Sequence, residues 1–311
     1  MIKLTDAEWQ VMRIVWERQP VTANEATQDL YESQAWTIST VKTLLSRLVD
    51  KGLIQAEPQG KKYLYQAIWT ERECVISEMK QALHRIYGGH LRYQSNRFAF
   101  FGAQLNTDLK DFASFLEDRT DRIENRYAFK MDERQEIIMY RTKARMHSAL
   151  GLADAPEWLR AAWVWDIIHL APEDSFDDIQ FKAAALFVWM QRVIFSVNSS
   201  APYWLSQGIA AFESDLINPS RLAKTMESLL PTLRQDAVLN LGNHYELFRL
   251  QGGYELTTTA VQFIVRTFGW DRLVEFVKHP DAYEELFHLS QDDFWHEWFK
   301  QVDTEYSGKE S

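Results

Sequence analysis

The chain has 311 residues, of which 46% are hydrophobic and 25% are charged, with only 12 Gly and 8 Pro. This composition excludes collagen-like and broadly disordered proteins, and the length suffices for about two domains. The formal charge of −10 taken alone argues against nucleic-acid binding. However, the first 90 residues carry 11 of the 34 basic and 11 of the 44 acidic side chains. The whole acidic excess lies in the later part of the chain, so we expect two modules with different partners.

The sequence indicates neither a membrane span nor an export signal. Its longest apolar run, residues 183–190, is far short of the roughly 20 residues that a membrane helix needs. The N-terminus, MIKLTDAEW, lacks a charged region followed by an apolar one. Cys74 is the only cysteine, so no intrachain disulfide can form. We therefore expect a cytoplasmic protein with no membrane contact.

Two short amphipathic helices are predicted at the start of the chain. Residues 4–17, LTDAEWQVMRIVWE, place apolar side chains near helical spacing after a Thr5 or Asp6 cap. Residues 23–33, ANEATQDLYES, form the second helix with Thr22 as its cap, and their narrow apolar face is expected to pack on the first helix.

The next segment, WTISTVKTLLSRLVDKGLI, carries the first functional signal. It predicts a helix that begins after Thr37 and stops at Gly52. Short hydroxyl side chains on its outward face would let the helix approach base edges, while Lys and Arg reach phosphates or guanine. An ordinary solvated face is the alternative interpretation. The inward stripe consists of Ile38, Val41, Leu45 and Leu48, and the outward face of Ser39, Thr40, Lys42, Thr43, Ser46 and Arg47.

A two-stranded hairpin is predicted after this helix. Residues 54–57 and 61–67 read as strands joined by a turn at Pro58-Gln59-Gly60, with Lys61 and Lys62 at the tip. Three helices followed by a basic hairpin form a winged helix-turn-helix.

The residues of this module resemble the BlaI/MecI/CopY family of penicillinase and copper-responsive repressors. The matching stretches are LTDAEWQVMRIVWE, TANE, WTISTVKTLLSRLVDKGLI and GKKYLYQA, which together cover roughly residues 4–70. The resemblance implies a homodimeric repressor that places its third helix in the major groove of palindromic double-stranded DNA, with the wing on the backbone. It assigns DNA contacts to Ser39, Thr40, Lys42, Thr43, Arg47, Lys61 and Lys62.

The chain departs from this family in two respects. Copper-responsive members carry a cysteine-rich motif near the C-terminus, and a chain whose only cysteine is Cys74 cannot form one. In addition, the usual short dimerisation segment is followed here by some 220 residues. We expect residues 1–70 to form the winged helix and residues 71–95 to form a helical linker or dimerisation segment that ends at Gly88-Gly89.

Residues 96–311 are predicted to form an α+β domain that is mainly helical. A short strand is expected in the pattern that begins at Asn96, and further strands are expected near residues 136–142 and 162–170, the last as one strand or a pair. A long helix between the first two strands turns Leu109, Phe112, Phe115, Leu116 and Ile123 inward. Further helices are expected around 144–150 and over 181–197, 201–214, 220–230 and 254–279.

This second part resembles the peptidase-MA-like zinc metallopeptidases of the gluzincin type. The likeness lies in IIHLAPED, FKAAALFVWMQRVIF, APYWLSQGIAAFES, GYELTTTAVQFIVRTFG and DDFWHEWFK, in that order. Such enzymes hold Zn²⁺ with two His at i and i+4 of one helix and a Glu from a later helix, and a Glu beside the first His activates water. The resemblance therefore implies a metallopeptidase-like fold.

The predicted zinc site has lost its ligands. The HExxH motif falls on residues 188–192, so that Val188 and Arg192 replace the two His and Trp189 replaces the catalytic Glu. Gln207, in WLSQGIA, replaces the downstream Glu. The remaining His residues of this part form no i, i+4 pair, and no other catalytic motif is present. We expect no metal, no cofactor and no enzymatic activity.

The vacated cleft is predicted to be lined by Val188, Trp189, Arg192, Trp204 and Gln207, together with Tyr254 and Glu255. This mixture of aromatic and polar groups suits a peptide or small-molecule effector. Alternatively, the Val188 and Trp189 side chains fill the hole, and the domain serves in dimerisation or partner docking. Residual catalytic activity is a third alternative.

The sequence therefore predicts a DNA-binding transcriptional regulator, a repressor by resemblance, with an inactive metallopeptidase-like domain. Two alternatives come from other classes of protein. One is a zinc-dependent peptidase that uses its winged helix to dock on protein, and the other is a protein-interaction module without DNA binding. Metal content would test the first alternative, and selection from random-sequence DNA would test the second.

Overall fold

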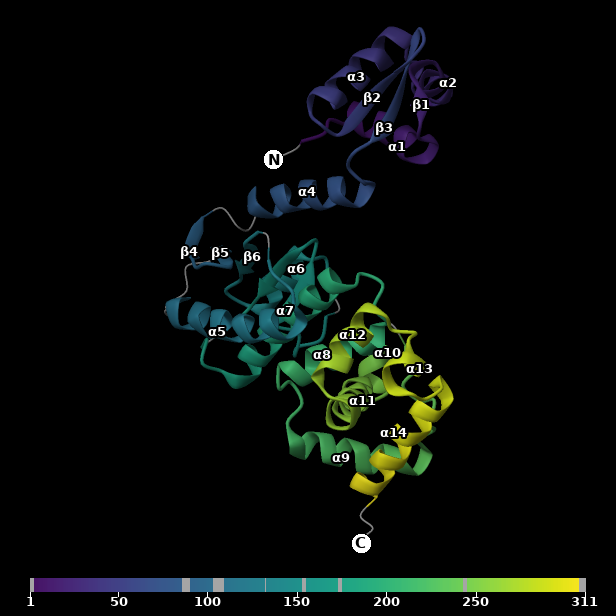
Figure 1. The fold of residues 1–311 in the computed structure, drawn as a ribbon. Coiled ribbons are helices and arrows are strands. Elements are labelled where there is room, and N and C mark those ends of the chain that lie inside the picture. Colours follow the sequence, from purple (N-terminus) through teal and green to yellow (C-terminus); the bar gives the residue numbers. More distant parts are fainter. Residues whose placement is uncertain are drawn as a thin grey trace. The chain divides into compact units, whose positions relative to one another are not determined.

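A computed structural model describes residues 3–85, 90–102, 109–131, 133–152, 155–172, 175–242 and 245–307. The chain divides into two compact units, Met1–Ile86 and Tyr87–Ser311 (Figure 1). Each unit has its own hydrophobic core, and no buried residue belongs to both cores. Among the described helices, none combines the length and apolar character that crossing a membrane requires.

Three helices form most of the first unit: α1 (Asp6–Arg18), α2 (Ala23–Gln34) and α3 (Ile38–Asp50). Their caps confirm the sequence prediction. The Thr5 and Thr22 side chains each accept a hydrogen bond from the backbone NH of a Glu three residues later, and that Glu binds back to the cap. Thr37 caps α3 through the NH of Thr40.

The predicted inward stripe of α3 is wrong at one position. Val41, Leu44, Leu45 and Leu48 are buried, whereas 40% of Ile38 is exposed to solvent. Ile38 is the first residue of the helix, where the neighbouring helix α2 offers a shallow groove lined by polar residues and Tyr31 instead of an apolar face. Leu44, which was not included in the predicted stripe, is buried instead.

The wing is an antiparallel hairpin of β2 (Ile54–Gln59) and β3 (Lys62–Ala67). Gln59 pairs with Lys62, so the turn consists of Gly60 and Lys61, and the predicted turn at residues 58–60 is wrong. Gly60 has a φ of 63°, a left-handed conformation that glycine adopts without strain. A short strand that the sequence did not suggest, β1 (Val21–Thr22), pairs with β3 and completes the sheet order β1-β3-β2.

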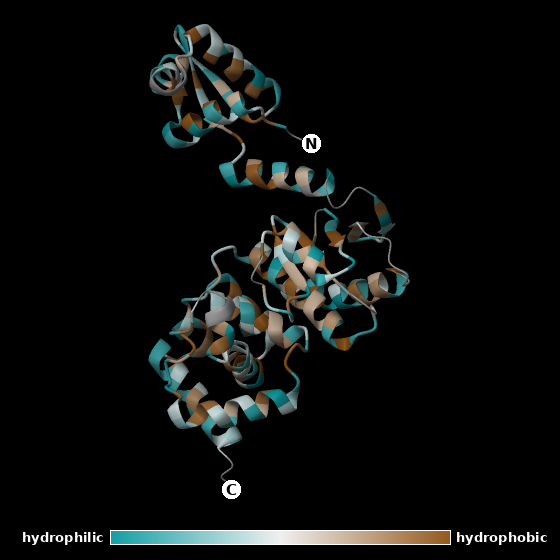
Figure 2. Cartoon of the chain, turned by 180° about the vertical axis from the view of Figure 1, so that it is seen from behind, coloured by the Kyte–Doolittle hydropathy of each residue, from teal (hydrophilic) through white to brown (hydrophobic). Residues whose placement is uncertain are grey.

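Helix α4 (Glu71–Leu83) belongs to the first unit. Its Cys74 is 1% exposed and lies in the core of that unit, and Glu78 accepts a hydrogen bond from the backbone NH of Leu4. Hydrophilic and hydrophobic residues alternate along α4 in Figure 2. The segment 71–95 is therefore divided between the two units instead of forming a linker throughout. Its expected end at Gly88-Gly89 lies outside the described residues.

A five-stranded sheet opens the second unit, with the order β4-β5-β6-β8-β7. The inner strands β5, β6 and β8 are parallel, and the edge strands β4 and β7 are antiparallel to their neighbours. Residues 162–170 thus form a strand pair, and β4 precedes the predicted start of this domain. The strands are β4 Leu91–Gln94, β5 Phe98–Gly102, β6 Gln135–Met139, β7 Ala161–Val164 and β8 Ile167–Leu170.

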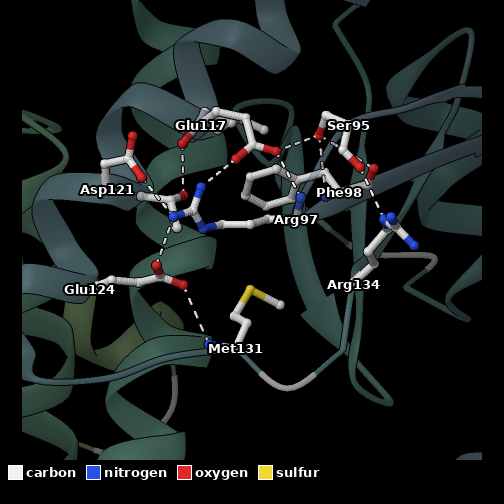
Figure 3. Close-up of polar contacts among 10 residues, drawn as sticks. Ser95, Arg97, Phe98, Glu117, Asp121, Glu124, Met131 and Arg134 are labelled. Carbon is white, nitrogen blue, oxygen red and sulfur yellow. Dashed lines mark hydrogen bonds and ion pairs between the residues drawn. The ribbon is translucent and has the colours of Figure 1, made fainter.

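A cluster of ion pairs joins the start of β5 to helix α5 (Leu109–Tyr127), as Figure 3 shows. The Arg97 guanidinium donates to Glu117, Asp121 and Glu124 at distances of 2.6–2.8 Å. Glu117 also accepts from the Ser95 hydroxyl at 2.6 Å. The Phe112, Leu116 and Ile123 side chains of α5 are buried as predicted, and Leu109 and Phe115 pack at the edge of the same core.

Helices form the rest of the second unit. Figure 1 shows α11 at the centre of the later helices, in contact with α8, α9, α10, α12 and α14. The predicted segment 254–279 is two helices, because Gly269 breaks it with a φ of 89°. The helices are α6 Lys143–Ala149, α7 Ile179–Val197, α8 Tyr203–Glu213, α9 Pro219–Leu229, α10 Tyr245–Leu250, α11 Gly253–Phe268, α12 Trp270–Lys278, α13 Tyr283–Phe287 and α14 Gln291–Tyr306.

Candidate nucleic-acid interface and candidate ligand cavity

The outward face of α3 exposes a continuous set of hydroxyl and basic side chains. The opposite, apolar face of the helix packs on the core of the first unit, so these side chains point away from that core. Thr43 donates its hydroxyl to the backbone oxygen of Ser39 at 2.9 Å, which fixes its rotamer on the helix surface. The exposed residues are Ser39, Thr40, Lys42, Thr43, Ser46 and Arg47.

The wing places two further cations on the same unit. Lys61 lies in the hairpin turn and Lys62 begins β3, and both are exposed. Within the described residues, neither of these lysines nor Lys42 nor Arg47 forms an ion pair, whereas Lys51 binds the buried Glu8 at 2.7 Å. The four unpaired cations are therefore available to phosphate groups.

Comparisons with known proteins concern this first part of the chain. Residues 4–113 match the penicillinase repressor family. A penicillinase repressor of Bacillus licheniformis is 24% identical over 120 residues, which cover 39% of this chain and 94% of the relative. The family match defines the penicillinase-repressor region, residues 4–113.

Other relatives of this penicillinase-repressor region include the methicillin resistance regulatory protein MecI of Mammaliicoccus sciuri. It is 28% identical over 87 residues, which cover 28% of this chain and 71% of MecI. The solution structure of the DNA-binding domain of the repressor BlaI is 29% identical, with a TM-score of 0.21, and covers 22% of this chain and 84% of that domain. These similarities do not test the peptidase-like resemblance of residues 96–311, which stays a prediction.

A second candidate site lies outside the penicillinase-repressor region, in the later unit. It is a cavity of about 770 Å³ bordered by α7 and α8, the helices that carry the predicted degenerate zinc site, and by the edge strand β7. Besides seven aliphatic side chains, its described lining contains five aromatic side chains, three arginines and three glutamines. The aromatic, arginine and glutamine residues are Trp158, Trp163, Phe187, Tyr203, Tyr254, Arg160, Arg221, Arg249, Gln180, Gln191 and Gln207.

Only some of the residues that were predicted to line this cleft line the cavity. Val188 and Gln207 line the cavity, as does Tyr254. Trp189 and Trp204 instead belong to the hydrophobic core: Trp189 is 1% exposed with its ring centroid 5.3 Å from that of Phe98, and Trp204 packs on Trp295.

Arg192 also lies away from the cavity lining. Its Nε atom is 2.6 Å from Asp166 Oδ1, and its guanidinium carbon lies 6.0 Å from the centroid of the Trp163 ring. The prediction that Trp189, Arg192 and Trp204 line one cleft is therefore wrong. The other predicted member, Glu255, is buried beside Arg221, with Arg221 Nε donating to Glu255 Oε1 at 2.8 Å.

Helical geometry explains this division. Ala184, Phe187, Val188 and Gln191 are spaced at i, i+3, i+4 and i+7, which places them on one face of α7, and all four line the cavity. The Gln191 amide donates to the Gln207 amide at 2.9 Å. The α7 residue that meets Gln207 is thus one position earlier than the predicted Arg192. The i, i+4 spacing from Phe187 to Gln191 was the sequence signal that could have identified this face.

The cavity lining has no evident metal-binding chemistry. In the part of the chain that the structure describes, no three His, Cys, Asp or Glu side chains are grouped so that they could hold a metal ion. Burial raises the pKa of Tyr254 well above its ordinary value, so this phenol stays protonated at neutral pH. The described lining therefore offers hydrogen-bond donors, guanidinium groups and aromatic rings.

Proposed function

We propose that the protein is a DNA-binding transcriptional regulator, with α3 and the wing forming its contact surface. The observation that carries this proposal is the exposed hydroxyl and basic face of α3, whose cations have no acidic partner within the described residues. The penicillinase-repressor match covers the same residues and favours repression as the outcome. Ser39, Thr40, Lys42, Thr43 and Arg47 contact the major groove, and Lys61 and Lys62 contact phosphates.

A mobility-shift assay with DNA flanking the gene tests this proposal. Arg47→Ala should weaken binding by about tenfold or more, because a guanidinium contact to a base edge or phosphate is worth roughly 1–3 kcal/mol. Thr43→Ala should have a smaller effect in the same direction. Arg13, which is exposed on α1 and outside the proposed surface, supplies the control variant Arg13→Ala. Equal shifts for all four proteins would contradict the assignment of α3.

The salt dependence of binding provides an independent measurement. The four exposed cations, Lys42, Arg47, Lys61 and Lys62, each neutralise a phosphate on the DNA, so the affinity of one subunit should fall by roughly a hundredfold between about 50 and about 200 mM salt. A plot of the logarithm of the binding constant against the logarithm of the salt concentration has a slope of roughly one per phosphate contact. The double variant with Lys61→Gln and Lys62→Gln should reduce this slope by about two. A slope that is unchanged would remove the wing from the interface.

We further propose a homodimer that binds a palindromic operator. One support is the family resemblance. The other is an apolar side chain on the free side of α4: Met79 is 38% exposed, whereas Cys74 on the opposite side packs in the core of the first unit. Selection from random-sequence DNA should enrich palindromes, and sedimentation should give twice the mass of the chain. Enrichment of single half-sites by a monomer would contradict the dimer.

The second unit is proposed as a regulatory domain without a catalytic reaction. The cavity between α7, α8 and β7 supports control by a bound effector. Cleavage within residues 91–97 is disfavoured, because β4 is paired with β5 and Ser95 and Arg97 are held by Glu117. Zinc at one equivalent per chain in the purified protein would contradict this role and favour a peptidase.

A further inference from the structure

The cavity of the second unit combines an apolar body with an unusual set of polar groups. Its volume of about 770 Å³ lies in the range of small-molecule sites. The aromatic rings of Trp158, Phe187 and Tyr254 and the side chains of Ala184 and Val188 supply most of its apolar lining. A ligand with a flat or branched apolar body would remove this surface from water.

Two tyrosines and a glutamine in the lining have hydrogen-bonding atoms that the protein does not use. Tyr254 is 7% exposed, yet within the described residues its hydroxyl has no hydrogen-bond partner, and neither has that of Tyr203. The only hydrogen bond of the Gln207 side chain in this part of the chain is the one to Gln191. These atoms are therefore free to form hydrogen bonds with a ligand in the cavity.

The charges in the lining favour an anion. Among the described residues no Asp or Glu lines the cavity, whereas Arg160, Arg221 and Arg249 do. Asp178 balances Arg160 and Glu255 balances Arg221. Arg249 has no carboxylate partner within the described residues, and its guanidinium carbon lies 5.7 Å from the centroid of the Trp158 ring. Counting only the part of the chain that the structure describes, the site therefore carries one uncompensated positive charge beside an aromatic surface, in a chain whose net charge is −10.

We propose that this cavity binds a small organic anion that joins an apolar, preferably aromatic, body to a carboxylate or a similar group. The body occupies the space between Trp158, Phe187 and Val188. The anionic group pairs with Arg249 and accepts hydrogen bonds from Tyr203 or Tyr254. This inference rests on the proposed regulatory role of the second unit and names the chemical class of its effector.

The structure favours a ligand of this size over a metal-bound substrate. The positions that the resemblance assigns to the metal are Val188, Arg192 and Gln207, and none of these side chains is a zinc ligand of that kind. The amide pair of Gln191 and Gln207 closes the space between α7 and α8.

Calorimetric titration of the full-length protein with two matched probes tests the proposal. The probes are naphthalene carboxylate and its uncharged isostere naphthalene carboxamide. We expect the carboxylate to bind at least about tenfold more tightly than the amide, because a charge-assisted hydrogen bond is stronger than a neutral one.

Three variants locate the binding. Arg249→Gln should remove the preference for the carboxylate, and Val188→Trp should abolish binding of both probes by filling the cavity. Ala184→Phe, on the same face of α7, repeats the filling test if Val188→Trp fails to fold. Arg272→Gln removes an exposed arginine of α12 outside the cavity and should bind like the unmodified protein.

Several outcomes would overturn the inference. These are the absence of binding by both probes, equal affinities for acid and amide, or an unchanged preference in Arg249→Gln. The result is separate from DNA binding, because the titration contains no DNA. Carboxylate binding by a protein that shifts no DNA would sustain this inference and reject the proposed regulator, and the reverse result would do the opposite.

Discussion

Glu8 and Glu25 occupy the same place in the capping boxes of two successive helices, but their surroundings differ. Glu8 is 1% exposed and binds Lys51 Nζ at 2.7 Å, whereas Glu25 is at the surface. Burial tends to raise the pKa of Glu8, but hydrogen bonds from Lys51 and Thr5 outweigh it and leave the pKa lowered. The pKa of Glu25 is also lowered, by its hydrogen bonds with Thr22.

Replacing these two residues should therefore have unequal effects. Glu8→Gln should lower the free energy of unfolding of the first unit by about 1–3 kcal/mol, because it leaves Lys51 without its charged partner. Glu25→Gln should cost less, because water replaces the lost contacts. Since the folded pKa of Glu8 is depressed, its contribution is complete above the ordinary value of 4.5 and is lost as the pH falls below it. Urea unfolding followed by tryptophan fluorescence measures both, and equal losses would contradict this account.

His169 is a buried titratable group in the interior of the second unit. It lies on β8 between neighbouring strands, and its Nδ1 atom is 2.9 Å from the Tyr140 hydroxyl. Burial lowers its pKa from 6.5 to about 4, against a smaller opposing effect of the Val164 backbone. The imidazole is therefore neutral in the folded protein at physiological pH.

This burial predicts a pH-dependent stability for the second unit. In the unfolded chain the His169 imidazole takes up a proton as the pH falls below 6.5. In the folded chain it stays neutral until the pH reaches about 4. The stabilisation is thus complete above pH 6.5, and roughly 3 kcal/mol is lost as the pH falls through this window. His169→Gln should lose less stability over the same window, as measured by urea unfolding at a series of pH values. Parallel curves for the two proteins would show that another group is responsible.

At the scale of elements, helices α8 and α11 cross in close contact. A Cβ atom added at Gly208 would lie 2.7 Å from the backbone oxygen of Thr257 and 2.9 Å from its Cβ. The two helices carry the cavity residues Gln207 and Tyr254 beside this contact. Glycine is thus required here by close approach rather than by backbone conformation.

Gly208→Ala should therefore destabilise the second unit by about 1–3 kcal/mol, because backbone atoms must shift to admit the methyl group. Thermal unfolding measures this loss. Ser206→Ala on the same helix is the control, since Ser206 is only partly buried and its removal creates no clash. A Gly208 variant as stable as the control would mean that the helices separate without cost.

Elements were predicted well where a cap and a long apolar period agreed. The capping boxes of Thr5 and Thr22 and the stop near Gly52 are local signals, and the helices follow them. Local signals failed where a neighbour decides the outcome. Ile38 lies at a position of the apolar period that should be buried, yet α2 does not cover it. Which face of α7 lines the cavity likewise depends on the elements that pack against that helix.

At the scale of the whole molecule, the two units have separate cores and differ in net charge. The first 90 residues are balanced in charge, whereas the remainder holds 23 basic and 33 acidic side chains. An acidic surface is repelled by the DNA backbone, so the charge distribution itself favours contact through the first unit.

Separate cores predict separate folding. A fragment of residues 1–86 should unfold cooperatively at the temperature of the first unit in the full chain. A fragment of residues 1–70 should be less stable by about 1–3 kcal/mol, because it lacks the buried Cys74 and the bond from Leu4 to Glu78. Calorimetry of both fragments tests this. Equal stability would mean that α4 is a linker, as the sequence first indicated.

The sequence by itself predicted the winged helix, because caps, apolar periods and turn residues act within a few positions of one another, and it indicated the face of α3 that we propose as the contact surface. It also indicated that the later part is α+β and has lost the His and Glu residues of the resembled peptidases. Only the tertiary structure decided that α4 joins the first unit, that Ile38 is exposed, and that Gln191, rather than Arg192, meets Gln207. These facts depend on which surfaces are brought together across long separations in the chain, and local patterns do not contain that information.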